Sequence, residues 1–278
     1  MSAGPSFEPS LIFDQTFWVV MLLFIGPCLG SFASAIIHRS RTGQSWIFAP
    51  SSAGTKSARS ACPHCGGQLR WFDLLPILSW VFLRGRCRMC KAGISAFYPL
   101  LELAALVMCQ ALYWCLGPSI ETAIAVSTVP FVLTLLVMSW QGDALPSDVL
   151  AVLLGLALGQ RAVEALYAPE TLKVLGDGLM GAALFMGAGA LLGSIRSKLL
   201  GVRYALRAEL PLLATMGVWF GVTLLPVVLI IAGVYGVLVA VARMLAGLPK
   251  QTGMTHPYIS AFFISLLFGE KILGLLMS

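Results

Sequence analysis

Four cysteines, spaced as two pairs, are the residues of this chain whose types and spacing most directly predict chemistry. Cys62 and Cys65 form one Cys-x-x-Cys pair, which two glycines follow. Cys87 and Cys90 form the second pair. Paired thiolates at this spacing are the ligands of closed tetrahedral zinc sites, and the glycines permit the tight turn that such a knuckle needs. We therefore predict a structural zinc ion bound by all four sulfurs; a knuckle pair without metal is the alternative.

A carboxylate at the edge of an apolar stretch is the second such feature. Glu209 lies in the run LRAELPLLATMGVWFG close to Arg207, and no further charged residue occurs before Arg243. Such an acid is either a functional group or a helix-terminal residue that the helix dipole favours. Which of the two applies depends on the helices that position it.

The composition places those helices in a membrane. Of 278 residues, 58% are hydrophobic and only 11% are charged, which is far too apolar for a soluble domain of this length. Several apolar segments approach the roughly 20 residues that span a bilayer. The sequence predicts an all-α polytopic membrane protein of about eight helices, in which the boundary near Pro226 is the least sharply marked. The expected helices cover residues 17–37, 98–116, 119–140, 145–166, 174–194, 210–224, 225–246 and 257–277.

The positions of Lys and Arg predict the orientation of these helices. Residues 38–97 carry many basic side chains against Asp73 alone, so the positive-inside rule places this stretch in the cytoplasm and both chain termini outside. Thiolates in the cytoplasm stay reduced and available to a metal. The first apolar run shows no cleavage signal and is expected to remain as a helix. The net charge of +6 indicates orientation and contact with anionic lipid rather than nucleic-acid binding.

Three parts are therefore expected along the chain. Residues 1–37 form an N-terminal segment and the first transmembrane helix, residues 38–97 form a cytoplasmic four-cysteine zinc loop, and residues 98–278 form a transmembrane helical bundle. Within the bundle, Asp177 is expected in an interfacial loop because glycines flank it. His256 is expected at a helix edge, also at the interface.

Two runs of this sequence resemble the N-terminal half of the type IV prepilin peptidases. They are GPCLGSFASAIIHRS and CPHCGGQLRWFDLLPILSWVFLRGRCRMCKAGISAFYPLLELAA. Those enzymes have a Gly-Ser-Phe signature followed by Arg, and two Cys-x-x-Cys knuckles around a Pro-x-x-Ser-Trp segment, with an Arg-Gly before the second knuckle. An Ile-Ser-x-x-Tyr-Pro-x-x-Glu entry into the second helix comes next. A weaker similarity continues through LPLLATMGVWFG and HPYISAF, the latter near the family's Gly-Pro-Tyr. The matching residues of the first part are Gly30, Ser31, Phe32, Arg39, Pro76, Ser79, Trp80, Arg84, Gly85, Ile94, Ser95, Tyr98, Pro99 and Glu102.

The resemblance implies an intramembrane aspartyl peptidase and N-methyltransferase of the bacterial inner membrane. Such an enzyme cuts a leader after a glycine in a type IV pilin or a pseudopilin of type II secretion. It then methylates the new N-terminus with S-adenosylmethionine. Two aspartates share the cleavage: one, deprotonated, activates water, while the other, protonated, donates to the scissile carbonyl.

The catalytic positions are where this chain departs from the family. Glu209 aligns with the second aspartate, but the glycines beside that aspartate are replaced. Ser139 stands at the position of the first aspartate. The nearest acids are Asp143, one helical turn further on, and Asp148, which follows Pro146. An extra methylene and lost glycines change the reach of the acid and its backbone freedom.

These departures leave three functional classes. The first is a relative with weak or lost peptidase activity and a binding or assembly role for pilin-like helices, which the departures favour. The second is an active leader peptidase and N-methyltransferase that uses Glu209 with Asp143 or Asp148 as catalytic acids. In the first class, Asp143 is a solvated loop acid and Asp148 an N-capping residue. The third is a transporter, for which the sequence shows no paired broken-helix repeat.

Overall fold

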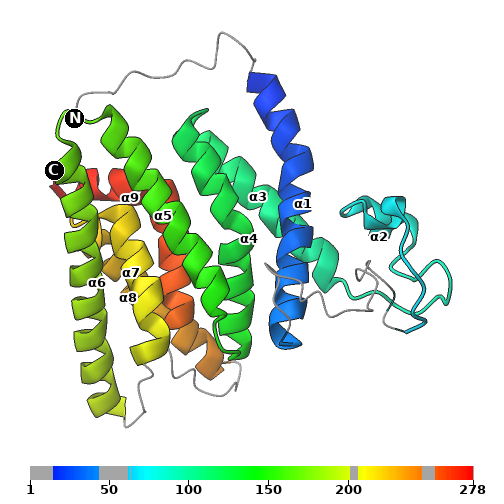
Figure 1. Cartoon of the computed structure of the whole chain (residues 1–278). Coiled ribbons are helices and arrows are strands. Elements are labelled where there is room, and N and C mark those ends of the chain that lie inside the picture. The colour runs from blue at the N-terminus through cyan, green and yellow to red at the C-terminus, as the bar shows by residue number, and fades with distance from the viewer. Residues whose placement is uncertain (1–14, 44–61, 63, 201–205, 246–253, 278) are drawn as a thin grey trace, which may run out of the picture. The chain divides into compact units, whose positions relative to one another are not determined.

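The computed structural model describes residues 15–43, 62, 64–200, 206–245 and 254–277 (Figure 1). Two short helices, η2 (Trp71–Leu74, a 3-10 helix) and α2 (Leu78–Phe82), lie in the segment that carries the cysteines. The long helices are α1 (Gln15–Arg41), α3 (Phe97–Leu116), α4 (Ile120–Gln141), α5 (Ser147–Tyr167), α6 (Thr171–Leu200), α7 (Leu206–Phe220), α8 (Leu225–Leu245) and α9 (Thr255–Met277).

The long helices match the helices expected from the sequence. Within the described residues, seven are long and apolar enough to cross a membrane, and α7 has a shorter apolar portion, Glu209–Phe220. The chain is therefore an all-helical, multi-pass membrane protein. The boundary near Pro226 is also defined: α7 ends before Gly221, whose φ is 64°, and Pro226 lies in the first turn of α8. A helix's first turn tolerates proline because its N–H groups have no intrahelical partner there.

By internal packing the chain divides into two compact units, of which one covers Ile12–Ala111. In this unit α1 and α3 approach closely at two glycines. A Cβ atom added to Gly26 would lie 2.8 Å from Leu106 Cα, and one added to Gly30 would lie 2.5 Å from Glu102 Cα. No side chain larger than hydrogen fits at either point. The glycine of the Gly-Ser-Phe signature therefore has a packing function.

The second unit contains Leu112–Ser278, and its closest helix pair is α6 with α7. A Cβ atom at Gly217 would lie 2.5 Å from the backbone of Ala182, and one at Gly181 would collide with the carbonyl oxygen of Gly217. Small residues let helices approach in a membrane, where van der Waals packing drives their association. Helix α7 also packs against α5, and α9 packs against α8 and α4.

One expectation about a single residue in this unit was wrong. Asp177 lies inside α6 rather than in a loop, because α6 begins at Thr171 and runs through the flanking glycines. His256 lies at a helix edge, as expected, in the first turn of α9, and it is buried, with 7% of its surface exposed. The burial of His256 arises from contacts between helices, which the local sequence does not reveal.

Candidate functional site

The two Cys-x-x-Cys pairs form knuckles with the same backbone hydrogen bonds. In each, the amide of the first cysteine donates to the carbonyl five residues on, and the amide four residues on donates back to the first cysteine's carbonyl. These N···O distances are 2.9 and 2.8 Å at Cys62, and 2.8 and 3.0 Å at Cys87. The residue four positions on has a positive φ in both knuckles, 66° at Gly66 and 58° at Lys91. The knuckles are thus structurally equivalent.

The four cysteine sulfurs converge on one point. All four Sγ atoms lie within 4.8 Å of one another, and those of Cys62 and Cys90 are 3.9 Å apart. In a tetrahedral site with Zn–S bonds of about 2.3 Å, the sulfurs are separated by about 3.8 Å. Cys62 and Cys87 are buried, and Cys65 and Cys90 are exposed. The predicted ligands are therefore brought together in a geometry that fits a zinc-ribbon-like loop.

The thiol groups of this cluster influence one another's ionisation. The backbone amides of Cys90 and Met89 hydrogen-bond the Cys87 sulfur and lower the pKa of its thiol to about 7. The Ala92 amide lowers the pKa of Cys90, but burial and the three neighbouring thiols outweigh it and raise that pKa to about 11. One thiolate therefore forms readily and opposes the formation of others. A divalent cation would remove this conflict because it stabilises every thiolate that binds it.

The equivalence of the knuckles leads to a prediction about Lys91. A non-glycine residue in the left-handed region is strained by about 1 kcal/mol, whereas glycine is not. Because Gly66 occupies the same place in the first knuckle, we expect Lys91→Gly to keep or slightly raise the urea concentration at which the segment releases bound zinc. The control is Ala92→Gly, where φ is not positive, so the added chain entropy should lower this midpoint. A lower midpoint for Lys91→Gly than for Ala92→Gly would contradict the equivalence.

Trp80 holds the second knuckle in place. Its indole Nε1 donates to the Ile94 carbonyl at 3.0 Å, and its own carbonyl accepts from the Gly85 amide at 2.8 Å. Gly85 has a φ of 65°, and a Cβ atom there would lie 2.9 Å from the Trp80 ring. The Ile94 amide closes the group by donating to the Gly85 carbonyl at 2.7 Å. The Ser-Trp, Arg-Gly and Ile-Ser elements of the sequence signature are therefore parts of one packed unit.

A buried carboxylate ties this segment to a membrane helix. Glu102 of α3 is 8% exposed and accepts a hydrogen bond from the Ile77 amide at 2.6 Å. Ile77 has a φ of 60°, which a β-branched residue rarely adopts. This bond and one from the Ser31 side chain of α1 give the buried carboxylate polar partners, without which its burial would be strongly unfavourable. The glutamate of the Tyr-Pro-x-x-Glu element thus connects α3 to residues 62–96, here called the knuckle segment.

Glu209 lies in the first turn of α7, as the sequence indicates, but its contacts are to another helix. Its carboxylate Oε1 accepts from the Met254 amide at 2.9 Å and from the Thr255 hydroxyl at 3.0 Å. Both donors belong to the start of α9, where helix amides lack intrahelical acceptors and the dipole favours negative charge. Only 3% of Glu209 is exposed. Glu209 therefore joins α7 to the first turn of α9.

The other two candidate acids lie at the connection between α4 and α5. Helix α4 ends at Gln141, and Gly142 adopts a left-handed C-cap with a φ of 79°, so Asp143 follows the helix rather than extending it. Asp148 lies in the first turn of α5, after the N-cap Pro146, and its Oδ1 accepts from the Val149 amide at 2.9 Å. Asp148 is therefore a first-turn acid rather than the N-cap residue itself. Asp143 and Asp148 are both partly exposed.

An aromatic stack that the sequence did not reveal occupies the same end of the bundle. The His256 ring, directly after Thr255, lies 5.1 Å from the Trp140 ring and 5.7 Å from the Tyr235 ring, centroid to centroid. Trp140 adjoins Ser139, which is buried and donates to the Leu136 carbonyl at 3.0 Å. The end of α4 and the start of α9 are thus packed together by side chains. Neither helix carries a local signal for this pairing.

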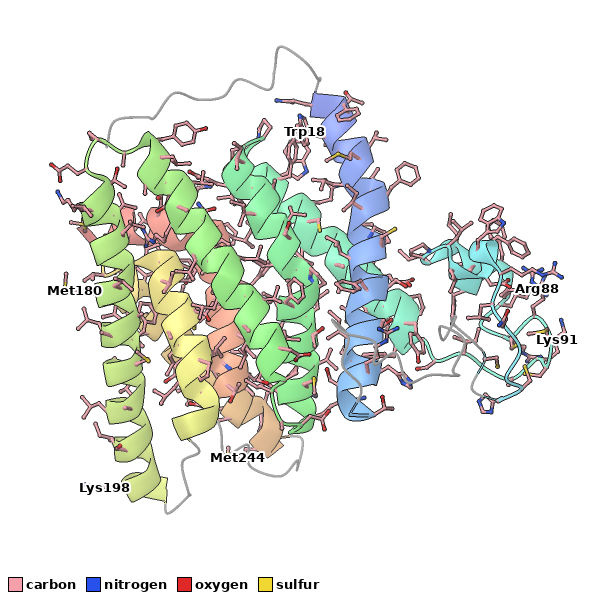
Figure 2. All side chains as sticks on the ribbon, viewed as in Figure 1. Trp18, Arg88, Lys91, Met180, Lys198 and Met244 are labelled. Carbon is pink, nitrogen blue, oxygen red and sulfur yellow. The ribbon has the colours of Figure 1, made fainter. Side chains whose placement is uncertain are left out.

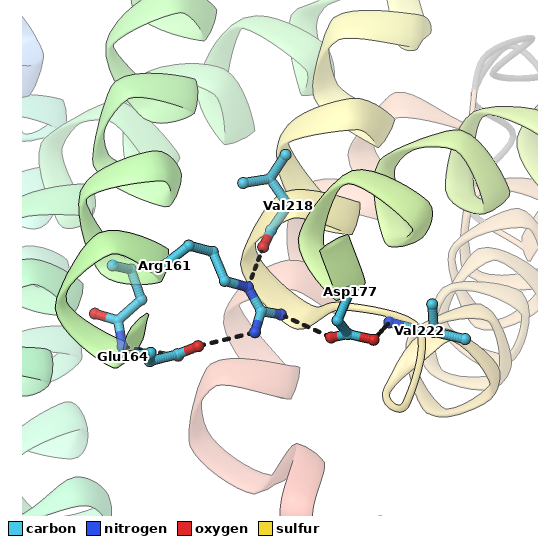
Figure 3. Close-up of polar contacts among 6 residues, drawn as sticks. Arg161, Glu164, Asp177, Val218 and Val222 are labelled. Carbon is cyan, nitrogen blue, oxygen red and sulfur yellow. Dashed lines mark hydrogen bonds and ion pairs between the residues drawn. The ribbon is translucent and has the colours of Figure 1, made fainter. Parts of the chain in front are cut away.

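A second missed feature is a polar network where α5 ends, α6 begins and α7 ends (Figure 3). Arg161 of α5 donates from Nε to the Val218 carbonyl at 2.6 Å and from Nη1 to Glu164 Oε2 at 2.8 Å. Its Nη2 lies 3.6 Å from Asp177 Oδ2. Asp177 Oδ1 in turn accepts from the Val222 amide at 3.2 Å. One guanidinium therefore connects three helices.

These observations define the class of protein: a multi-pass helical membrane protein whose first two long helices are separated by a four-cysteine knuckle segment. The sequence model described as the bacterial peptidase A24 N-terminal domain matches residues 24–116, which include that segment. No solved structure matches the chain.

Three relatives, each named prepilin leader peptidase/N-methyltransferase, match most of the chain. The protein of Burkholderia pseudomallei (strain 1026b) is 30% identical over 241 residues, which cover 81% of this chain and 76% of the relative. That of Aeromonas hydrophila is 30% identical over 268 residues, 88% of each chain. That of Stutzerimonas stutzeri is 29% identical over 278 residues, 92% of each. The chain belongs to the prepilin leader peptidase/N-methyltransferase family.

Proposed function

We propose that this member of the family binds pilin or pseudopilin-like helices in an assembly role and has weak or no leader peptidase activity. The contacts of Glu209 are the observation that carries this proposal. A catalytic carboxylate must exchange protons with water and with the scissile peptide. Oε1 of Glu209 instead accepts two hydrogen bonds from the start of α9, and the side chain is almost fully buried.

The residue aligned with the other family aspartate supports the same proposal. Ser139 has no carboxyl group with which to share a proton, and sharing one proton is what pushes the two pKa values of an acid pair apart. The adjacent Trp140 packs on the His256 ring. This end of α4 therefore contributes packing where the peptidase mechanism needs a second acid.

The knuckle segment supports the binding part of the proposal. It keeps the sequence signature of the family and, in this proposal, holds a structural zinc ion through Cys62, Cys65, Cys87 and Cys90. Such an ion would stabilise the segment as a rigid surface beside α1 and α3, because a closed four-thiolate site contributes folding energy and has no open position for chemistry.

The second candidate is an active leader peptidase and N-methyltransferase. It is favoured by one observation: Asp143 and Asp148 lie at the α4–α5 connection, next to the α4 end that packs on the start of α9. In that case Glu209 with one of these aspartates would cleave the leader. S-adenosylmethionine would be the methyl donor.

A cleavage assay separates the two candidates. We expect purified protein in detergent to cleave a prepilin with an intact leader at least about a hundredfold more slowly than an aspartate-bearing relative, since positioning errors of this kind cost about that much. Glu209→Gln and Asp143→Asn should leave any residual rate unchanged. Efficient cleavage that Glu209→Gln removes would overturn the proposal and establish glutamate as a catalytic acid.

The same variants test folding and binding. The amide oxygen of a glutamine at position 209 can still accept from Met254 and Thr255, so expression and retention of a pilin transmembrane peptide should be nearly unchanged. Glu170→Gln, an acid that pairs with Lys173 at 3.2 Å on the surface, is the control for the charge change alone. Loss of peptide retention in Glu209→Gln but not in Glu170→Gln would show that Glu209 itself forms part of the binding surface.

We also propose the orientation that the basic residues indicate: the bacterial inner membrane, with both termini outside and the knuckle segment in the cytoplasm. Alkaline phosphatase, which is active only outside, should be active when fused after residue 278. Green fluorescent protein, which matures only inside, should fluoresce when inserted at Ser52. The reverse pattern of activities would overturn the orientation.

A further inference from the structure

We propose that residues 71–82, which comprise η2 and α2 and are here called the interfacial segment, insert their apolar side chains into the surface of an anionic lipid bilayer. The segment would hold the knuckles against the membrane rather than leave them free in solution. This inference does not depend on whether the chain is an active peptidase.

Large apolar side chains on the interfacial segment are exposed rather than packed. Phe82 is 80% exposed and Trp71 is 76% exposed. Soluble surfaces seldom carry large apolar patches without a partner, so we infer that a partner covers these side chains. The other exposed members are Leu74, Leu75, Leu78 and Val81.

The depth of the segment identifies lipid as that partner. The Ile77 amide is held by Glu102 of α3, which in turn faces Gly30 of α1. Helix α1 has 27 residues and ends at Arg41. A span needs about 20 residues, so even if all of the excess projects beyond the membrane on this side, Gly30 lies within the apolar layer. Figure 1 accordingly shows α2 beside α1 and not beyond its end.

The charges around the segment match an anionic headgroup layer. Asp73 is the one acid between residues 62 and 96, and it is paired with Arg88 at 2.8 Å. Arg70 also interacts with Asp73, and the other exposed cations in that stretch are Arg84, Arg86 and Lys91. Figure 2 shows Arg88 and Lys91 on the side of the segment away from α1. Apolar side chains with flanking Arg and Lys are the pattern of helices that lie in the interface of an anionic membrane.

Trp71 provides a direct test. The purified protein is placed in nanodiscs whose lipids carry bromine near the top of the acyl chain, and tryptophan quenching is compared between wild type and Trp71→Phe. The Trp71 component is the emission of wild type minus that of Trp71→Phe, measured in brominated and in non-brominated lipid. If Trp71 contacts acyl chains, this component is weaker in brominated lipid; if Trp71 is in water, it is equal in both. We expect bromine to quench the Trp71 component about twofold or more.

Variants and lipids separate the alternatives. Phe82→Asp should reduce quenching of the Trp71 component at least about twofold, whereas Met89→Gln, which changes an exposed apolar residue outside the segment, should not. Zinc content measured on each variant identifies any that fail to fold. If Phe82→Asp fails to fold, the comparison of wild type with Trp71→Phe decides the test. Quenching should be stronger with phosphatidylglycerol than with neutral lipid alone. A Trp71 component that bromine does not quench, equal quenching in both lipids, or shielding of Trp71 only after a pilin peptide is added would overturn the proposal.

Discussion

Replacing Cys62 and Cys87 together by serine is expected to abolish metal binding and unfold the knuckle segment. Each knuckle loses its buried sulfur, and the two remaining sulfurs cannot form a closed tetrahedral site. Metal binding to such sites is largely folding free energy, so loss of the ion and loss of structure coincide. Elemental analysis should find about one zinc per wild-type chain and less than about a tenth in the variant. Retention of a pilin peptide should be lost as well.

The control for this change is Cys109→Ser together with Cys115→Ser, which alters two cysteines of α3 outside the cluster. Zinc content of this variant should equal that of wild type. The expectation is contradicted if wild-type protein purified without chelators carries less than about half an equivalent of zinc. It is also contradicted if the double knuckle variant keeps both its zinc and its resistance to proteolysis between residues 62 and 96.

Arg161→Met is expected to produce the largest loss of stability in the helical bundle. The change leaves Glu164 and Asp177 without their shared cation and the Val218 carbonyl without a donor. Removing one partner from a largely buried ion pair typically destabilises by about 3 kcal/mol or more, because the remaining charge stays desolvated. The midpoint of unfolding in a denaturing-detergent titration should fall accordingly, and helices α5, α6 and α7 should become accessible to protease together.

A surface pair at the same end of α6 provides the matched control. Lys173 and Glu170 are 3.2 Å apart and largely exposed, so Lys173→Met should leave the midpoint almost unchanged. Adding Asp177→Asn to Arg161→Met should restore part of the lost stability, since one uncompensated charge is removed. Equal losses in Arg161→Met and Lys173→Met would mean that the network in Figure 3 makes no special contribution.

The features that the sequence predicts well are those with local signals. The helices follow from apolar runs, the knuckles follow from cysteine spacing, and the end of α4 before Asp143 follows from Gly142. The sequence signature around Trp80 also has a local cause, since its parts pack on one another within a few residues of each knuckle.

The features that it misses depend on which helices become neighbours. Arg161 and Val218 are 57 residues apart in sequence, and Glu209 and Met254 are 45 apart. An isolated Glu in a first helical turn predicts an interaction with its own helix, which explains why the role of Glu209 at α9 could not be foreseen. His256 is a similar case, because its two aromatic partners come from α4 and α8.

The hydrogen bond between Ile77 and Glu102 has a consequence for biogenesis. When α3 packs on α1, the Glu102 carboxylate lies next to Gly30 and interacts with the Ser31 side chain, and the Ile77 amide is its second partner. That partner arrives only when the segment between the two helices has folded, and in our proposal this folding requires zinc. The hairpin of α1 and α3 is therefore complete only when zinc is available on the side of the membrane that holds this segment. We expect a cell short of zinc to accumulate hairpins in which this buried acid lacks the Ile77 amide as a partner.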